Sequence, residues 1–103
     1  MQEILEKMLE KNIQNSKESV FLFFAKDRSD ACRRMENDIL LAEEKYPHSK
    51  VYKIILQKQP NTFTNFHIHF VPSVVVVKNG VEVFRITGTS YNYSILQIFS
   101  QFS

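Results

Sequence analysis

The stretch PSVVVVKNGVEVFRITG, residues 72–88, decides the fold class of this chain. Two runs rich in Val, Ile and Phe meet at Asn79 and Gly80, and both of these residues tolerate the positive φ of a tight hairpin turn. The stretch therefore predicts two neighbouring antiparallel strands.

A second unit is predicted before this hairpin. VFLFFA, residues 20–25, is a continuous apolar run between polar residues, typical of a central strand that is covered on both faces. VYKIIL, residues 51–56, predicts another strand. Ser29 or a neighbouring Asp can cap a helix between the two strands, and Pro47 ends it. The apolar residues of this helix alternate steps of three and four: Cys32, Met35, Ile39, Ala42 and Tyr46. A strand, a helix and a strand in this order predict a right-handed parallel unit.

Helices are predicted at both ends of the chain. The first is amphipathic, with Ile4, Leu5, Met8, Leu9 and Ile13 on its buried face. The last follows Gly88, with an apolar face made by Tyr91, Ile95, Ile98, Phe99 and Phe102. A short helix is expected over residues 61–67. We expect one domain, residues 1–103, since this length suits a single core.

Composition excludes several classes of function. The net charge is only +2 and the basic residues are spread along the chain, so we expect no nucleic-acid partner and no membrane partner. Acidic residues interrupt the first turns, which is unlike a secretory signal, and the apolar runs are too short to span a bilayer. One cysteine cannot form an internal disulfide, which favours the reducing cytoplasm.

Two stretches resemble the thioredoxin family. FLFFAKDRSDACRRM, residues 21–35, resembles the family's strand, turn and active-site helix, and VPSVVVVKNG, residues 71–80, resembles its proline hairpin. The resemblance implies an α/β thioredoxin-like fold with a mixed four-stranded sheet flanked by helices. The N-terminal strand of full thioredoxins is not expected here. It also implies a cis peptide bond before Pro72, against the alternative of an ordinary trans proline opening an edge strand.

The family's CxxC box falls on Ser29, Asp30, Ala31 and Cys32, so oxygen replaces the nucleophilic sulfur at the first position. Exchange between a dithiol and a disulfide requires both sulfur atoms. Arg28 stands where the family has Trp, and Ala31 where it usually has Pro. Phe23 takes the place of a buried acid, which leaves Lys53 without that partner, so we expect the Lys53 ammonium to extend to solvent. The resemblance therefore implies a degenerate site without dithiol oxidoreductase activity.

Cys32 has two interpretations. It takes the position of the family's more buried thiol, and its place on the apolar face of the helix favours a packed, inert side chain. Lys26, Arg28, Arg33, Arg34 and the helix dipole would favour a reactive thiolate. We favour burial over reactivity.

The region before Pro72 could form a metal site or a peptide-binding groove. His67 and His69 could bind zinc with Cys32, but a closed structural site needs four ligands, so solvated loop histidines are favoured and no metal or other cofactor is expected. A hydrolase triad with Ser29 is rejected, because Ser29 is better explained as a helix cap. The backbone at Val71 could pair with an extended peptide. The predicted substrate-binding residues, which together define this groove, are Arg28, Asp30, Ala31, His69, Phe70, Val71 and Pro72.

The leading functional hypothesis is a thioredoxin-family protein with a redox-related or peptide-binding role in this groove. Its partner would be a protein or peptide, or a low-molecular-weight thiol. One enzymatic alternative is single-thiol exchange, in which Cys32 attacks a disulfide and an external thiol resolves it. The remaining alternative is a structural domain that packs against a partner.

Overall fold

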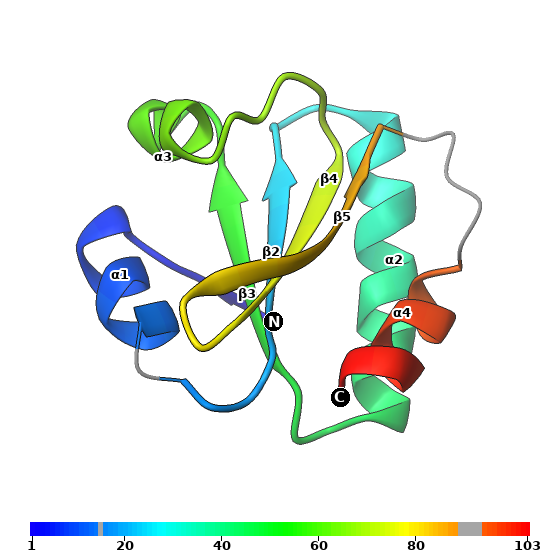
Figure 1. The fold of residues 1–103 in the computed structure, drawn as a ribbon. Coiled ribbons are helices and arrows are strands. Elements are labelled where there is room, and N and C mark those ends of the chain that lie inside the picture. Colours follow the sequence, from blue (N-terminus) through cyan, green and yellow to red (C-terminus); the bar gives the residue numbers. More distant parts are fainter. Residues whose placement is uncertain (15, 89–93) are drawn as a thin grey trace.

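The computed structural model describes residues 1–14, 16–88 and 94–103. Figure 1 shows a mixed sheet with helices on both sides. The strands are β1 (Gln2–Glu3), β2 (Val20–Ala25), β3 (Lys50–Ile55), β4 (Ser73–Lys78) and β5 (Val81–Thr87). The helices are α1 (Glu6–Gln14), α2 (Asp30–Lys45), α3 (Pro60–Asn65) and α4 (Ile95–Phe102).

The central strand and the hairpin are confirmed. The sheet order is β1-β3-β2-β4-β5, so β2 lies in the middle, parallel to β3 and antiparallel to β4. Strands β4 and β5 pair antiparallel across Asn79 and Gly80, whose φ angles are 53° and 75°. These are the positive values that the two-residue turn requires.

The expectation of four strands is wrong, because the sheet has five. β1 pairs parallel with β3, with Gln2 beside Tyr52 and Glu3 beside Lys53. The N–H of Ile4 continues this pairing by donating to the carbonyl of Lys53 at 3.1 Å. Two exposed polar residues carry no strand pattern, and it is the otherwise free edge of β3 that makes them a strand.

The buried face predicted for the first helix is also partly wrong. α1 begins only at Glu6, after β1, and Leu9 is its buried residue. Leu5 and Met8 are 57 % and 54 % exposed. Ile4 is buried, but it reaches the core from the segment between β1 and α1.

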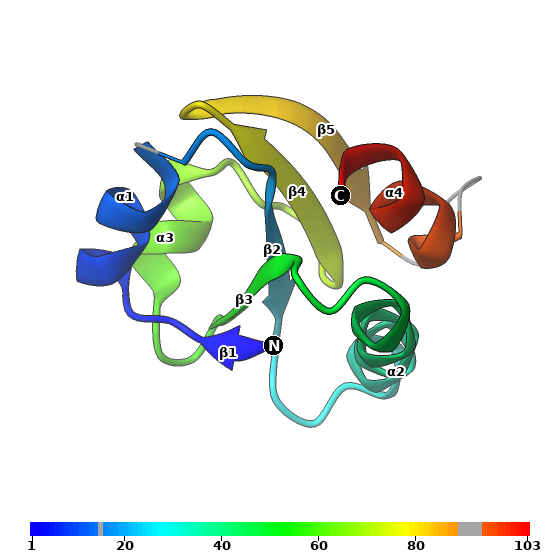
Figure 2. The same cartoon turned by 90° about the horizontal axis from the view of Figure 1, so that it is seen from below.

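The helices form two layers, with α2 and α4 on one face of the sheet and α1 and α3 on the other (Figure 2). Side chains of β2 alternate between them, because successive residues of a strand point to opposite faces. Phe21 and Phe23 belong to the core under α2 and α4, whereas Leu22 and Phe24 belong to the core under α1 and α3. All six residues of β2 are buried, as predicted for a strand covered on both faces.

The predicted helices after β3 and β5 are present with shifted bounds. α3 covers residues 60–65, where 61–67 was expected. α4 begins after Ser94, whose side chain and that of Gln97 form a reciprocal capping box. Tyr91, predicted for the apolar face of this helix, lies outside the described residues.

Within the described ranges, no helix has both the length and the apolar character to cross a membrane.

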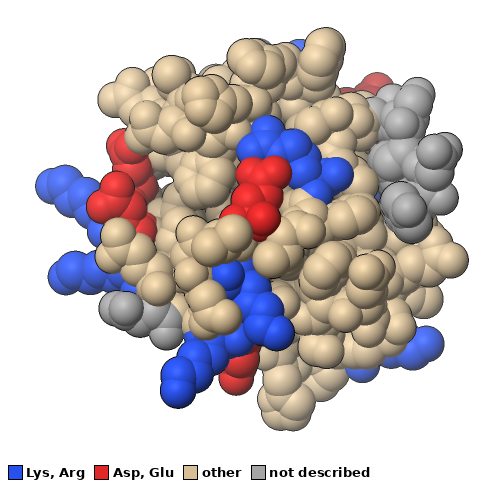
Figure 3. Space-filling view, in the orientation of Figure 1, with Lys and Arg blue, Asp and Glu red and all other residues tan. Residues whose placement is uncertain are grey.

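Charged side chains are dispersed over the face that carries β5. In Figure 3 the described Lys and Arg atoms lie in several separate places on this face, some beside Asp or Glu atoms. One such pair on β5 joins Arg85 to Glu82 at 2.7 Å. This face therefore presents no single basic surface among the residues described.

Candidate functional site

The predicted box lies at the start of α2, where the chain leaves the central strand. Ser29 has extended backbone angles and its Oγ accepts a hydrogen bond from the N–H of Cys32 at 3.2 Å. This confirms the predicted helix cap. The oxygen that replaces the nucleophilic sulfur of the resembling family is therefore held against the backbone of the helix.

Cys32 is buried, as its position on the helix predicted. It is 4 % exposed and belongs to the same core cluster as Met35 and Ile39. A hollow of about 100 Å³ lies beside it, and its lining includes Ser29, Glu36 and Lys53. The thiol is thus next to a small polar hollow but contributes almost no surface to solvent.

Lys53 has an acidic partner that sequence reasoning missed. Its ammonium forms an ion pair with the carboxylate of Glu36, and the two side chains are 28 % and 29 % exposed. The expectation that the ammonium extends to solvent without a partner is therefore wrong. Phe23, beside Lys53 in the β2–β3 register, supplies no acid, so the acid comes from α2. Glu36 follows Cys32 by four residues, a spacing that puts both on one side of a helix and could have indicated it.

The other charges around the box are exposed. Asp30 pairs with Arg33 on the first turn of α2, and about three quarters of each side chain faces solvent. Arg28 is exposed and has a φ of 60°, which is unusual for a residue with a side chain. Within residues 1–14, 16–88 and 94–103, Arg28 has no ion-pair partner. Its guanidinium is thus available to a ligand, whereas the carboxylate of Asp30 already has a partner.

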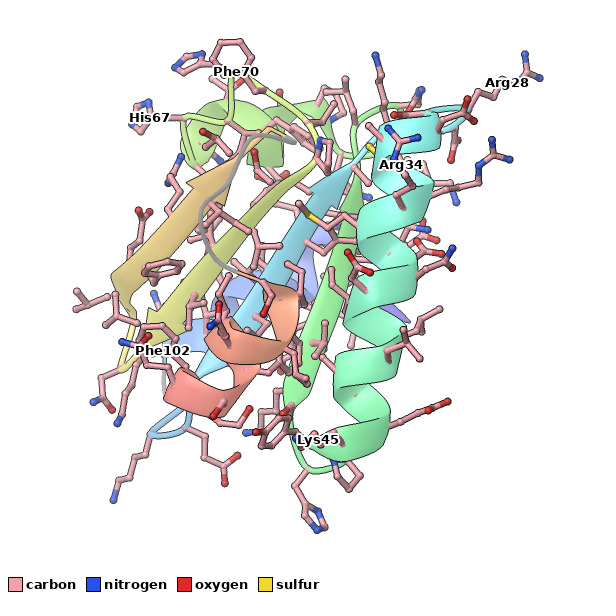
Figure 4. All side chains as sticks on the ribbon, turned by 90° about the vertical axis from the view of Figure 1, so that its right-hand side faces the viewer. Arg28, Arg34, Lys45, His67, Phe70 and Phe102 are labelled. Carbon is pink, nitrogen blue, oxygen red and sulfur yellow. The ribbon has the colours of Figure 1, made fainter. Side chains whose placement is uncertain are left out.

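Pro72 lies at the same end of the sheet as the box. Ser73 pairs with Phe24 near the end of β2, so Pro72 lies beside the point where β2 leads into the turn that ends at Ser29. Figure 4 shows Arg28 and Phe70 at this same end of the molecule. The peptide bond between Val71 and Pro72 is cis.

The segment before Pro72 presents both apolar surface and backbone groups. Phe70 is 67 % exposed and His69 is also exposed. Val71 is half-buried, and in the part of the chain that the structure describes neither its N–H nor its C=O makes a hydrogen bond. Pro72 is anchored instead, because its carbonyl accepts from the N–H of Gly88 at 2.8 Å. Of the predicted groove residues, Ala31 is half-buried and lies inside the first turn of α2.

Arg85 is a further residue of this region that sequence reasoning missed. From β5 it donates hydrogen bonds to the carbonyls of Phe66 at 2.7 Å and His67 at 3.2 Å. His67 has a φ of 55°, in the left-handed region that residues with a side chain rarely adopt. Arg85 thus holds the segment that leads to Pro72. No local sequence signal marks this role, since the bonded residues are 18 and 19 positions away.

The possible zinc ligands are distributed unfavourably. His67 and His69 are exposed on the loop, whereas Cys32 is buried in the core. Among the residues placed by the structure, no group of three or more His, Cys, Asp or Glu side chains could hold a metal ion.

Comparisons with known proteins agree with the architecture. Residues 5–103 match the family described as a thioredoxin-like domain. The thioredoxin of Fasciola hepatica superposes with a TM-score of 0.81 at 19 % identity, over 92 % of this chain and 91 % of that one. A mutant thioredoxin from Halobacterium salinarum gives a TM-score of 0.82 at 16 % identity, over 99 % and 88 % of the two chains. Thioredoxin from Trypanosoma brucei brucei gives 0.77 at 12 % identity, over 86 % and 78 %. No curated protein matches the sequence.

Proposed function

The chain belongs to the thioredoxin-like domain family, and from this premise we propose that it binds extended peptides through the groove beside Ser29 and Pro72, without dithiol oxidoreductase activity. The observation that carries the proposal is that the box, residues 29–32, has no exposed thiol. Ser29 caps α2 through its oxygen, and Cys32, the one cysteine of the sequence, is buried.

The chemistry of exchange explains why activity is lost. A dithiol enzyme attacks a disulfide with one thiolate and releases the mixed disulfide with a second thiol. A serine hydroxyl is not ionised at neutral pH and forms no bond to sulfur of this kind. With Ser29 in the first position the box is degenerate, and no internal disulfide can form.

Peptide binding does not depend on the missing sulfur. A peptide laid along residues 69–71 can exchange hydrogen bonds with the N–H and C=O of Val71, as a strand does when it is added to a sheet. Phe70 offers an exposed ring to an apolar side chain of the peptide. Arg28, a cation without an ion-pair partner among the described residues, favours peptides with an acidic residue.

Binding of a display library of ten-residue extended peptides tests this proposal. Phe70→Ala should weaken the selected peptides about 10-fold, the loss typical of an aromatic anchor, and Arg28→Gln should reduce the preference for acidic residues. Val83→Ala is the matched control, because Val83 is an exposed apolar residue of β5 and makes no part of the groove. Selected peptides that bind Phe70→Ala and Val83→Ala equally well would remove the groove from the proposal.

The hollow beside Cys32 supports single-thiol exchange as a second candidate. The Cys32 thiolate would attack one sulfur of a disulfide, form a mixed disulfide and release the other half as a thiolate. A low-molecular-weight thiol, also as thiolate, would then attack the bound sulfur, leave with it as a disulfide and return Cys32 as a thiolate. The burial of Cys32 opposes this candidate. Either role suits the cytoplasm, where a free thiol stays reduced.

A further inference from the structure

The exposed side of the α2–α4 layer carries apolar residues that no described element covers. A hollow of about 390 Å³ lies between the two helices, and its lining includes Leu41 and Leu96. Leu41 is 63 % exposed and Leu96 is 41 % exposed. Figure 4 looks onto this layer, with Lys45 at the lower end of α2, Arg28 near its upper end, and Phe70 at the top of the view on the side away from α2.

Two opposite charges bracket the apolar part of this face. Asp38, Leu41, Ala42 and Lys45 follow the spacing i, i+3, i+4 and i+7, which puts them on one side of α2. Asp38 and Lys45 both line the hollow and are both exposed. In the described part of the chain, neither is in an ion pair.

This arrangement is complementary to itself. Asp38 and Lys45 are equally far from the midpoint between Leu41 and Ala42, about 5 Å on either side along the helix axis. If a two-fold axis passes through that midpoint, the α2 helices of two copies run antiparallel. Asp38 of each copy then lies opposite Lys45 of the other, because a two-fold interface uses the same surface on both sides.

We propose that a second copy of this chain docks on this face. Antiparallel α2 helices pack Leu41 against Leu41 in the two-fold contact. Leu96 extends the apolar area, and two Asp38–Lys45 pairs close its ends. The dimer leaves the groove at the other end of α2 uncovered, so it does not depend on the proposed peptide binding.

Charge reversal provides the decisive experiment. Sedimentation velocity of the full chain from about 10 μM to about 1 mM should show a reversible monomer–dimer equilibrium. Asp38→Lys alone and Lys45→Asp alone each replace two attractive contacts by two repulsive ones. Each variant should therefore raise the dissociation constant about 10-fold or more. A one-to-one mixture of the two variants should recover the native dissociation constant, because each variant then meets its complement.

Leu41→Ser provides the apolar test and should also raise the dissociation constant about 10-fold. Leu5→Ser is its matched control, since Leu5 is similarly exposed but lies just before α1 on the opposite face of the sheet. Leu5→Ser should leave the equilibrium unchanged. A native chain that stays monomeric up to about 1 mM overturns the proposal. So does a dimer that persists in both charge variants, or a mixture that fails to associate.

Discussion

The ammonium of Lys53 on β3 is paired with the carboxylate of Glu36, which lies one helical turn after Cys32 on α2. The pair joins a strand to a helix beside the buried thiol and lines the same hollow. A charged group so placed needs its partner, because a half-buried charge without one is unfavourable.

The first prediction concerns this pair. A double-mutant cycle with Glu36→Gln and Lys53→Gln should give a coupling of about 1 kcal/mol in the free energy of unfolding, measured by urea denaturation. Asp30→Asn and Arg33→Gln form the matched control cycle, because that pair is about three quarters exposed and should couple by less than about 0.5 kcal/mol. Equal couplings in the two cycles would contradict a special role for the Glu36–Lys53 pair.

The second prediction concerns the lost sulfur. Ser29→Cys places a thiol at the start of α2, one turn before Cys32, and should allow an internal disulfide and catalysed reduction of insulin by dithiothreitol. The native chain should not exceed the uncatalysed rate. Ser29→Ala is the control: it should lower the free energy of unfolding by about 1 kcal/mol through loss of the cap and give no activity. Catalysis by the native chain would contradict the proposed function.

The third prediction concerns access to Cys32. Because the side chain is 4 % exposed, iodoacetamide at neutral pH should label it at least about 100-fold more slowly in the native chain than in guanidinium. Mass spectrometry after timed quenching measures both rates. Labelling of the native chain as fast as that of the unfolded chain would support single-thiol exchange instead.

The fourth prediction concerns Lys58, which joins the segment after β3 to β1. The hydrogen bond from its ammonium to Glu3, at 2.8 Å, and the charge of that carboxylate raise the pKa of Lys58 above the ordinary 10.5. A raised lysine pKa means that folding favours the charged form. Its contribution to stability is therefore complete below pH 10.5 and is lost as the pH rises through the raised pKa.

Nuclear magnetic resonance titration of labelled lysine measures this pKa. Glu3→Gln should bring it down towards 10.5, and Asp27→Asn should lower it less, because Asp27 makes the smaller contribution. A Lys58 pKa that is the same in the native chain and in Glu3→Gln would show that this contact is not made in solution.

Several parts of the fold were predictable because their signals are local. Asn79 and Gly80 carry the turn in their own backbone preferences, and they adopt the positive φ that the hairpin needs. Ser29 caps α2 through an atom three residues from its partner. The central position of β2 follows from its composition, since a strand covered on both faces is apolar throughout.

Other parts depend on residues that are distant in the chain. β1 is a strand because residues 2–3 reach the edge of β3, and nothing in Gln2 or Glu3 indicates it. Arg85 holds the loop before Pro72 through carbonyls that only the folded sheet brings within reach.

The sequence by itself determined which chemistry is available: one sulfur atom, an oxygen in the first position of the box, and no internal disulfide. Tertiary structure alone decided that Glu36 is the partner of Lys53 and that Arg85 holds the loop before Pro72, whereas the burial of Cys32 was already predicted from its place on the helix. The physical reason is that composition sets the reactive groups, whereas pairing depends on contacts between segments far apart in the chain.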